Sequence, residues 1–151
     1  MKQIVGQTIH DMEQTQILCK EIPELSFIAK AILEKYPDQR IFALRGSMGA
    51  GKTTFMHAMA EQLGCINRVS SPTFALVNEY VCENGGMVYN FDFYRIKNQK
   101  EARDIGFEEY LYSNKYCFIE WAENIEDLLP PETTNIFISV NEDDNSRQFV
   151  F

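Results

Sequence analysis

The chain has 151 residues, of which 45% are hydrophobic, and its formal net charge at pH 7 is −8. This length suits one folded domain, and the hydrophobic fraction is that of an ordinary globular protein. Direct, tight binding to nucleic acid needs clustered Lys and Arg, so the scattered basic residues and the acidic balance exclude it for the isolated chain.

The longest apolar runs are only as long as a strand, so we expect no membrane span. Residues 1–20 lack the continuous apolar region of a secretory signal. Four widely spaced cysteines form no Cys-x-x-Cys pair and have no histidine cluster nearby: Cys19, Cys65, Cys82 and Cys117. We therefore expect a cytoplasmic protein with reduced thiols and no zinc site.

In chain order, residues 23–36 have the apolar spacing of an amphipathic helix, with Pro23 in the first turn and Pro37 after the end. The apolar run 41–45 predicts a buried strand, and residues 51–63 predict a second helix with one apolar face.

Residues 46–53 join this strand to this helix and read Gly-Ser-Met-Gly-Ala-Gly-Lys-Thr. This is the phosphate-binding loop (P-loop) of nucleotide-binding proteins, in the strand–loop–helix setting that its mechanism requires. Its glycines let backbone N–H groups turn inward as an anion nest at a helix N-terminus. Lys52 can reach the β- and γ-phosphates, and the Thr53 hydroxyl can bind Mg²⁺. The predicted nucleotide-binding residues of the loop are Gly46, Ser47, Met48, Gly49, Ala50, Gly51, Lys52, Thr53 and Thr54.

A polar, irregular stretch follows the second helix and contains Ser70-Ser71-Pro72-Thr73. Its hydroxyls, on a loop stiffened by proline, could contact Mg²⁺ or the γ-phosphate, and the loop could order with ATP and relax with ADP. The alternative is an ordinary polar connection.

The rest of the chain alternates between strand-like and helical runs. Strands are predicted over 74–81, 87–93, 116–121, 134–140 and 147–151, and a helical segment divided by Gly106 over 98–112. These elements predict an α/β fold, a P-loop NTPase-like mixed sheet with helices on both faces, as a single domain over residues 1–151.

Two of these strands run into a carboxylate, Glu120 after residues 116–119 and Asp92 after residues 87–91. Chemistry on a nucleotide needs such an acid to hold Mg²⁺ directly or through water. An acid at a strand end is also often the first exposed residue of a loop. The residues leave open which of the two contacts the metal.

Together these motifs resemble the TsaE family, small bacterial P-loop ATPases of the machinery that makes threonylcarbamoyladenosine in tRNA. The resemblance covers nearly the whole chain and rests on four motifs in order. They are the phosphate loop within residues 44–55, the Ser-Pro-Thr segment and next strand within 69–80, the tyrosine, aspartate and Tyr-Arg signature within 88–95, and the Glu-Trp pair at 120–121 followed by Leu129-Pro130.

The resemblance implies an ATP-binding, Mg²⁺-dependent ATPase, slow on its own, that supports modification of adenosine 37 next to the anticodon. It implies docking on the heterodimer of TsaB and TsaD. The implied roles are phosphate and Mg²⁺ binding for Lys52 and Thr53, the metal-side acid for Glu120, ATP hydrolysis for Asp92, nucleotide sensing for Ser71 and Thr73, and a position beside the site for Trp121. Ser47 stands where the family usually carries an acid, and the backbone nest does not depend on that side chain.

Two alternatives use the same loop. A small-molecule kinase would need a substrate-binding domain and a lid carrying arginines, for which this length leaves little room. A GTP-dependent interaction switch would usually read guanine with Asn-Lys-x-Asp, whereas residues 114–117 read Asn-Lys-Tyr-Cys and lack the base-reading carboxylate.

Overall fold

The computed structural model describes residues 13–69 and 76–151. Within them, the strands form one eight-stranded sheet in the order β1-β8-β7-β2-β6-β5-β4-β3. The strands are β1 (Gln16–Cys19), β2 (Ile41–Arg45), β3 (Asn67–Val69), β4 (Val77–Val81), β5 (Met87–Asp92), β6 (Tyr116–Glu120), β7 (Thr134–Asn141) and β8 (Ser146–Val150). The helical elements are η1 (Ile22–Glu24), α2 (Leu25–Lys35), α3 (Lys52–Gln62), α4 (Gln99–Asp104), α5 (Phe107–Leu111) and η2 (Ala122–Leu128).

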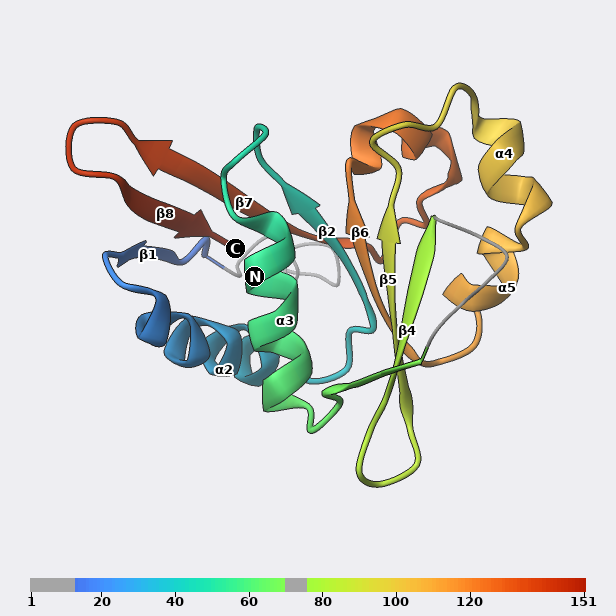
Figure 1. Ribbon diagram of the computed structural model, residues 1–151, viewed down its shortest axis with the longest axis horizontal. Coiled ribbons are helices and arrows are strands. Elements are labelled where there is room, and N and C mark those ends of the chain that lie inside the picture. The colour runs from blue at the N-terminus through green and yellow to red at the C-terminus, as the bar shows by residue number, and fades with distance from the viewer. Residues whose placement is uncertain (1–12, 70–75) are drawn as a thin grey trace, which may run out of the picture.

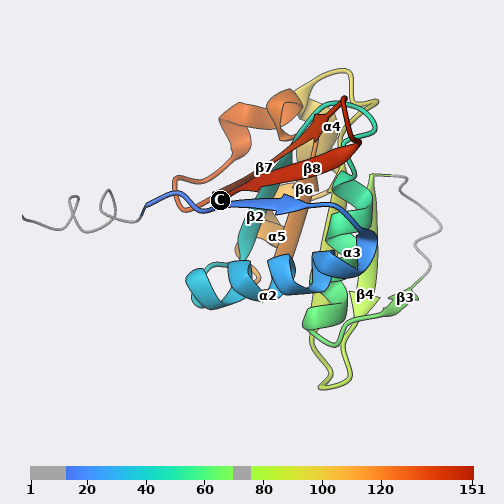
Figure 2. The ribbon, with the colours of Figure 1, turned by 90° about the vertical axis from the view of Figure 1, so that its left-hand side faces the viewer.

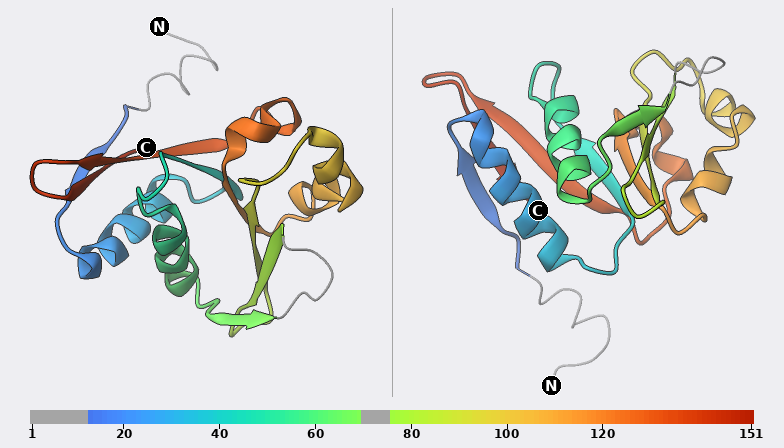
Figure 3. Two further views of the ribbon diagram at one scale, coloured as in Figure 1. Left: turned by 45° about the horizontal axis from the view of Figure 1, so that its top comes forward. Right: turned by 60° about the horizontal axis from the view of Figure 1, so that its bottom comes forward.

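The centre of the sheet is parallel and its two sides are antiparallel. Strands β7, β2, β6 and β5 run in one direction. On one side β8 and then β1 pair antiparallel, and on the other side β4 and then β3 do so. Figure 2 shows β1 beside β8, and Figure 3 shows the β7–β8 hairpin extending beyond the central strands.

Helices cover both faces of the central strands because successive side chains of a strand point to opposite faces. On β2, Phe42 and Leu44 pack into the core beneath α2 and α3. The alternate residues Ile41 and Ala43 pack into the second core, with side chains of α4, α5 and η2. Figure 1 shows the two helix groups on opposite sides of these strands. The predicted mixed sheet with helices on both faces is confirmed.

The parallel strands place their carboxyl ends at one edge of the sheet. The loop after β2 and η2 after β6 both lie at this edge (Figure 1). In sheets of this kind ligands bind at the carboxyl ends of the strands, so this edge holds the candidate site.

Most predicted elements are confirmed, with boundaries that shift by a few residues. Gly106 has φ +80° and divides the predicted helical segment into α4 and α5. Three short elements were not predicted: β1, β3 and η2. Strand β3 has three exposed residues and therefore no apolar pattern. Residues 74 and 75, predicted as strand, lie outside the described residues.

The expectation of four reduced thiols is wrong for one pair. Cys65, just after α3, and Cys82, just after β4, form a disulfide. Cys19 and Cys117 are free and buried. Burial raises the pKa of the Cys117 thiol to about 12. Among the described residues, no helix has the length and apolarity needed to cross a membrane.

Candidate functional site

The loop between β2 and α3 is shaped by two glycines. A hydrogen bond of 3.1 Å from the Ala50 N–H to the Ser47 carbonyl oxygen turns the loop. Gly51 precedes α3 with φ +103°, a left-handed conformation that L side chains rarely adopt. A Cβ on Gly46 would lie 2.5 Å from the backbone oxygen of Ile138 in β7. Glycine is thus required where the loop passes the neighbouring strand and where it enters the helix.

Lys52, the first residue of α3, is only 6% exposed. Its ammonium group donates a hydrogen bond to the Gly46 carbonyl oxygen and lies 3.6 Å from the centroid of the Trp121 ring. Burial lowers the pKa of Lys52, and nearby carboxylates, chiefly Glu123, oppose that shift. A carbonyl and an aromatic face therefore hold this cation above the loop.

Glu120, the last residue of β6, is only 3% exposed and faces the start of α3. Its Oε1 accepts a hydrogen bond of 2.7 Å from the Thr53 hydroxyl, and its Oε2 accepts one of 3.1 Å from the Asn90 amide. Burial raises the pKa of the Glu120 carboxyl, while the hydrogen bonds from Thr53 and Asn90 act in the opposite direction. The carboxylate is held at both oxygens and joins β5, β6 and α3.

Asp92 lies at the same edge as Glu120 but in a different setting. The parallel register of β5 and β6 pairs the two residues. The Asp92 side chain is exposed, and its Oδ1 accepts a hydrogen bond of 3.0 Å from the Tyr94 N–H. Asp92 therefore fixes the turn after its own strand, and Glu120 is the acid in contact with the Thr53 hydroxyl.

Trp121 does not continue β6, contrary to the strand predicted over 116–121. Its φ of +59° places it in the left-handed region, and η2 begins at the next residue. Such a backbone is an outlier for a bulky side chain and marks a constrained position. The turn brings the indole against the Tyr94 ring, with centroids 4.9 Å apart, and over the Lys52 ammonium.

The remaining predicted residues fall into two groups. The loop presents Ser47, Met48 and Gly49 to solvent and buries Ala50, while Thr54 is exposed on the first turn of α3. Ser71 and Thr73 of the predicted nucleotide-sensing segment lie outside the described residues.

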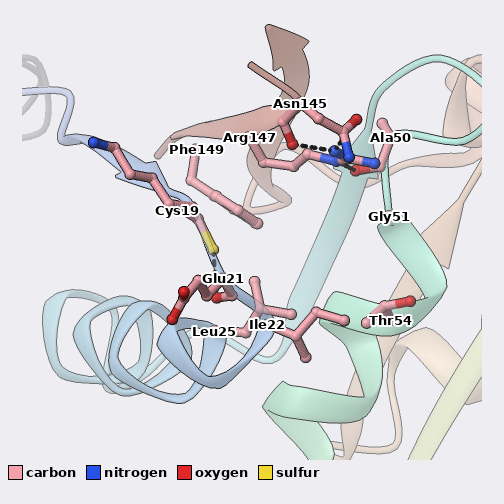
Figure 4. Close-up of a pocket in the computed structure, with 11 residues that line it drawn as sticks. Cys19, Glu21, Ile22, Leu25, Ala50, Gly51, Thr54, Asn145, Arg147 and Phe149 are labelled. Carbon is pink, nitrogen blue, oxygen red and sulfur yellow. Dashed lines mark hydrogen bonds between the residues drawn. The ribbon is translucent and has the colours of Figure 1, made fainter. Parts of the chain in front are cut away.

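A pocket of about 220 Å³ adjoins the outer side of the loop (Figure 4). The phosphate loop and α3 contribute Ala50, Gly51 and Thr54 to its lining, and the β7–β8 hairpin contributes Asn145, Arg147 and Phe149. The rest of the lining comes from the segment between β1 and the start of α2, namely Cys19, Lys20, Glu21, Ile22 and Leu25. Sequence reasoning missed this pocket. The β8 residues lie more than 90 positions after the loop, and no motif connects the two segments.

Comparison with known proteins gives a consistent result. The family model described as "Threonylcarbamoyl adenosine biosynthesis protein TsaE" matches residues 19–149. A tRNA threonylcarbamoyladenosine biosynthesis protein TsaE from Bacillus subtilis (strain 168) is 37% identical over 153 aligned positions, which cover 100% of this chain and 86% of that protein. The protein of the same name from Haemophilus influenzae is 34% identical, with 88% of this chain and 85% of that protein covered.

A solved structure agrees. The crystal structure of YdiB from Bacillus subtilis matches with a TM-score of 0.70 and 31% sequence identity, covering 92% of this chain and 84% of that one.

Proposed function

The chain belongs to the TsaE family, and on that premise we propose that it is a Mg²⁺-dependent ATPase subunit that supports threonylcarbamoyladenosine modification of tRNA. The relatives carry this modification in their names. The observation that carries the ATPase part of the proposal is the 2.7 Å contact between the Thr53 hydroxyl and the Glu120 carboxylate, beside Lys52 at the start of α3.

The oxygen pair formed by Thr53 and Glu120 fits Mg²⁺. This ion takes oxygen ligands and is usually bound through one or two carboxylates together with substrate phosphates. When bound, Mg²⁺ neutralises charge that develops on the β- and γ-phosphate oxygens. Asn90 holds the second carboxylate oxygen, so Glu120 keeps one orientation toward the Thr53 hydroxyl. We assign Glu120 as the acid on the metal side and Asp92 to a position one strand away.

The phosphates of the nucleotide would lie on the backbone N–H groups of the loop at the N-terminus of α3. In this arrangement the Lys52 ammonium exchanges its hydrogen bond with the Gly46 carbonyl for contacts with the β- and γ-phosphates. The Trp121 ring, which lies 3.6 Å from the Lys52 ammonium, would shield this cation from water.

We further propose that the nucleotide is ATP or ADP and not a guanine nucleotide. Residue 117, where a guanine-reading Asp would stand, is a cysteine that is buried within β6. It therefore offers no carboxylate to a base.

Calorimetric titration with ADP and with nonhydrolysable analogues of ATP and GTP, each with Mg²⁺, tests the proposal. We expect binding of the ATP analogue and ADP, weak binding of the GTP analogue, and loss of at least about 100-fold in affinity for Lys52→Ala, since a buried charged contact is removed. Lys30→Ala, at an exposed lysine of α2, is the matched control and should bind normally.

The same titration, together with the rate of ATP hydrolysis, distinguishes binding from chemistry. Glu120→Gln should still bind the ATP analogue but hydrolyse ATP about 10- to 100-fold more slowly with Mg²⁺. A preference for GTP, or normal binding by Lys52→Ala, contradicts the proposal. Normal hydrolysis by Glu120→Gln moves the metal role to Asp92.

A further inference from the structure

Arg147 of β8 reaches across the pocket to the backbone of the phosphate loop (Figure 4). Its Nε donates a hydrogen bond of 3.1 Å to the Ala50 carbonyl oxygen, and its Nη2 donates one of 3.2 Å to the Gly49 carbonyl oxygen. A single guanidinium group thus holds two successive carbonyls of the loop, from 97 and 98 positions away in the sequence.

Neighbouring groups fix the position of this side chain. The remaining nitrogen, Nη1, donates to the Asn145 carbonyl at 2.7 Å and to the Asn145 Oδ1 at 3.0 Å. Two residues further along β8, Phe149 is buried and packs on Phe55 of α3 with ring centroids 4.6 Å apart. Since alternate residues of a strand share a face, the Phe149 contact orients Arg147 toward the loop.

Holding the carbonyls also orients the N–H groups of the loop. In a trans peptide the N–H points away from the C=O of the same unit. When the Ala50 oxygen faces Arg147, the Gly51 N–H therefore points to the opposite side, at the N-terminus of α3, where backbone donors have no partner within the helix. Gly49 and Gly51 both have positive φ, and glycine is the residue most free to leave such a conformation.

The guanidinium also contributes charge. Among residues 13–69 and 76–151, no carboxylate lies within ion-pair distance of Arg147. Within this part of the chain its positive charge therefore has no direct partner, and the charge lies behind the loop on which an anion would be bound.

From these contacts we infer that Arg147 is a positioning residue for the phosphates of the nucleotide: it holds the loop in its anion-binding form through the Gly49 and Ala50 carbonyls. The inference rests on the proposed nucleotide binding by this loop. Because Arg147 contacts the loop and not the base, it should contribute equally to the binding of ATP, ADP and a bare polyphosphate.

The test compares Arg147→Gln and Arg147→Lys with the wild type. We expect Arg147→Gln to weaken binding of ADP, an ATP analogue and inorganic tripolyphosphate by similar factors of about 10- to 100-fold, the range for loss of hydrogen bonds to a charged group. In hydrolysis the KM should rise by the larger factor and kcat should change less, because the loop contacts the phosphates both before and during reaction. Arg147→Lys keeps the charge but cannot donate to both carbonyls with the planar guanidinium geometry, so its affinity should lie between those of Arg147→Gln and the wild type.

Arg40→Gln is the matched control. Arg40 likewise donates to two backbone carbonyls, those of Pro37 and Gln39, but at the entry to β2. It should leave the affinities within twofold of the wild type.

A second measurement does not depend on a nucleotide. Amide hydrogen exchange over residues 46–55 of the ligand-free protein should be faster in Arg147→Gln, while exchange over residues 134–141 stays unchanged. Unchanged exchange in the loop together with unchanged affinity overturns the inference. A loss confined to ATP and ADP, with tripolyphosphate unaffected, also overturns it and assigns Arg147 to the nucleoside.

The outcomes separate this inference from the proposed function. If the wild type binds ATP, and Lys52→Ala abolishes binding but Arg147→Gln does not weaken it, only the positioning role fails. If the wild type binds none of these ligands at the loop, both fail.

Discussion

The Glu120 carboxylate is held in a fixed position at the candidate site, but its burial disfavours the charged form when no ligand is bound. It is 3% exposed, and its two oxygens accept hydrogen bonds from Thr53 and Asn90. Burial nevertheless raises its pKa above the ordinary value of 4.5. In the ligand-free protein, burial therefore disfavours the charged form that the proposed function requires of a metal ligand, and bound Mg²⁺ would compete with a proton for this carboxylate.

This shift predicts a pH dependence of stability. With a raised native pKa, the native state binds more protons than the unfolded state once the pH exceeds about 4.5, so the free energy of unfolding falls as the pH rises through the native pKa. The Glu120→Gln variant has no carboxyl at this position, so its free energy of unfolding should not show this fall. The difference in unfolding free energy, variant minus wild type, should rise with pH and then level off.

Urea denaturation without nucleotide or Mg²⁺, between about pH 4.5 and 7.5, measures this difference. Glu61→Gln, at an exposed carboxylate of α3, is the control, and its curve should run parallel to that of the wild type. If the curve for Glu120→Gln also ran parallel to that of the wild type, burial would not shift the pKa of the Glu120 carboxyl.

At the scale of elements, the start of α3 is held by β8. Phe55 and Phe149 are both buried and pack against each other with ring centroids 4.6 Å apart. Arg147 extends the same face of β8 to the phosphate loop. The β7–β8 hairpin thus packs against the phosphate loop and α3, although the sequence motif of the loop involves only β2, the loop and α3.

Phe149→Ala should therefore act on stability and on the site together. We expect a loss of about 3–5 kcal/mol in the free energy of unfolding, because a buried aromatic side chain is removed. Nucleotide affinity should fall as well, since the strand that carries Arg147 loses its anchor. Phe27→Ala removes an aromatic side chain of α2 that is 75% exposed, and it should change stability by less than about 0.5 kcal/mol. Denaturant unfolding and the nucleotide titration give both quantities, and a loss below about 1 kcal/mol for Phe149→Ala would exclude the anchoring role.

At the scale of the whole molecule, the charge of −8 restricts the partners. An acidic chain repels the phosphate backbone of tRNA, whose binding depends on neutralisation by Lys and Arg. We therefore propose that the link to tRNA runs through partner proteins, TsaB and TsaD, and not through this chain.

The isolated chain should bind tRNA more weakly than about 10⁻⁴ M at physiological salt, the weak limit of non-specific binding. Fluorescence anisotropy with labelled tRNA measures this affinity. Co-purification with TsaB and TsaD, with and without Mg-ATP, is the companion experiment. Tight binding of tRNA by the chain alone, or no association with TsaB and TsaD in either condition, would contradict the proposed arrangement.

The sequence by itself determined the features that depend on neighbours along the chain. Apolar periodicity predicted the main helices and strands, and the spacing of glycines, Lys52 and Thr53 predicted the loop between β2 and α3. The apolar run 116–119 also identified Glu120 as an acid at a strand end, because a change from apolar to charged residues is visible along the chain itself.

Only the tertiary structure decided which distant groups meet. The residues alone left open which of Glu120 and Asp92 contacts the metal, and the order of β2, β6 and β5 in the sheet brings Glu120 to the Thr53 hydroxyl. The left-handed backbone of Trp121 and the reach of Arg147 to the loop were not predicted at all. Such contacts depend on strand order and register, which are set by the packing of the whole sheet and leave no periodic signal in the residues themselves.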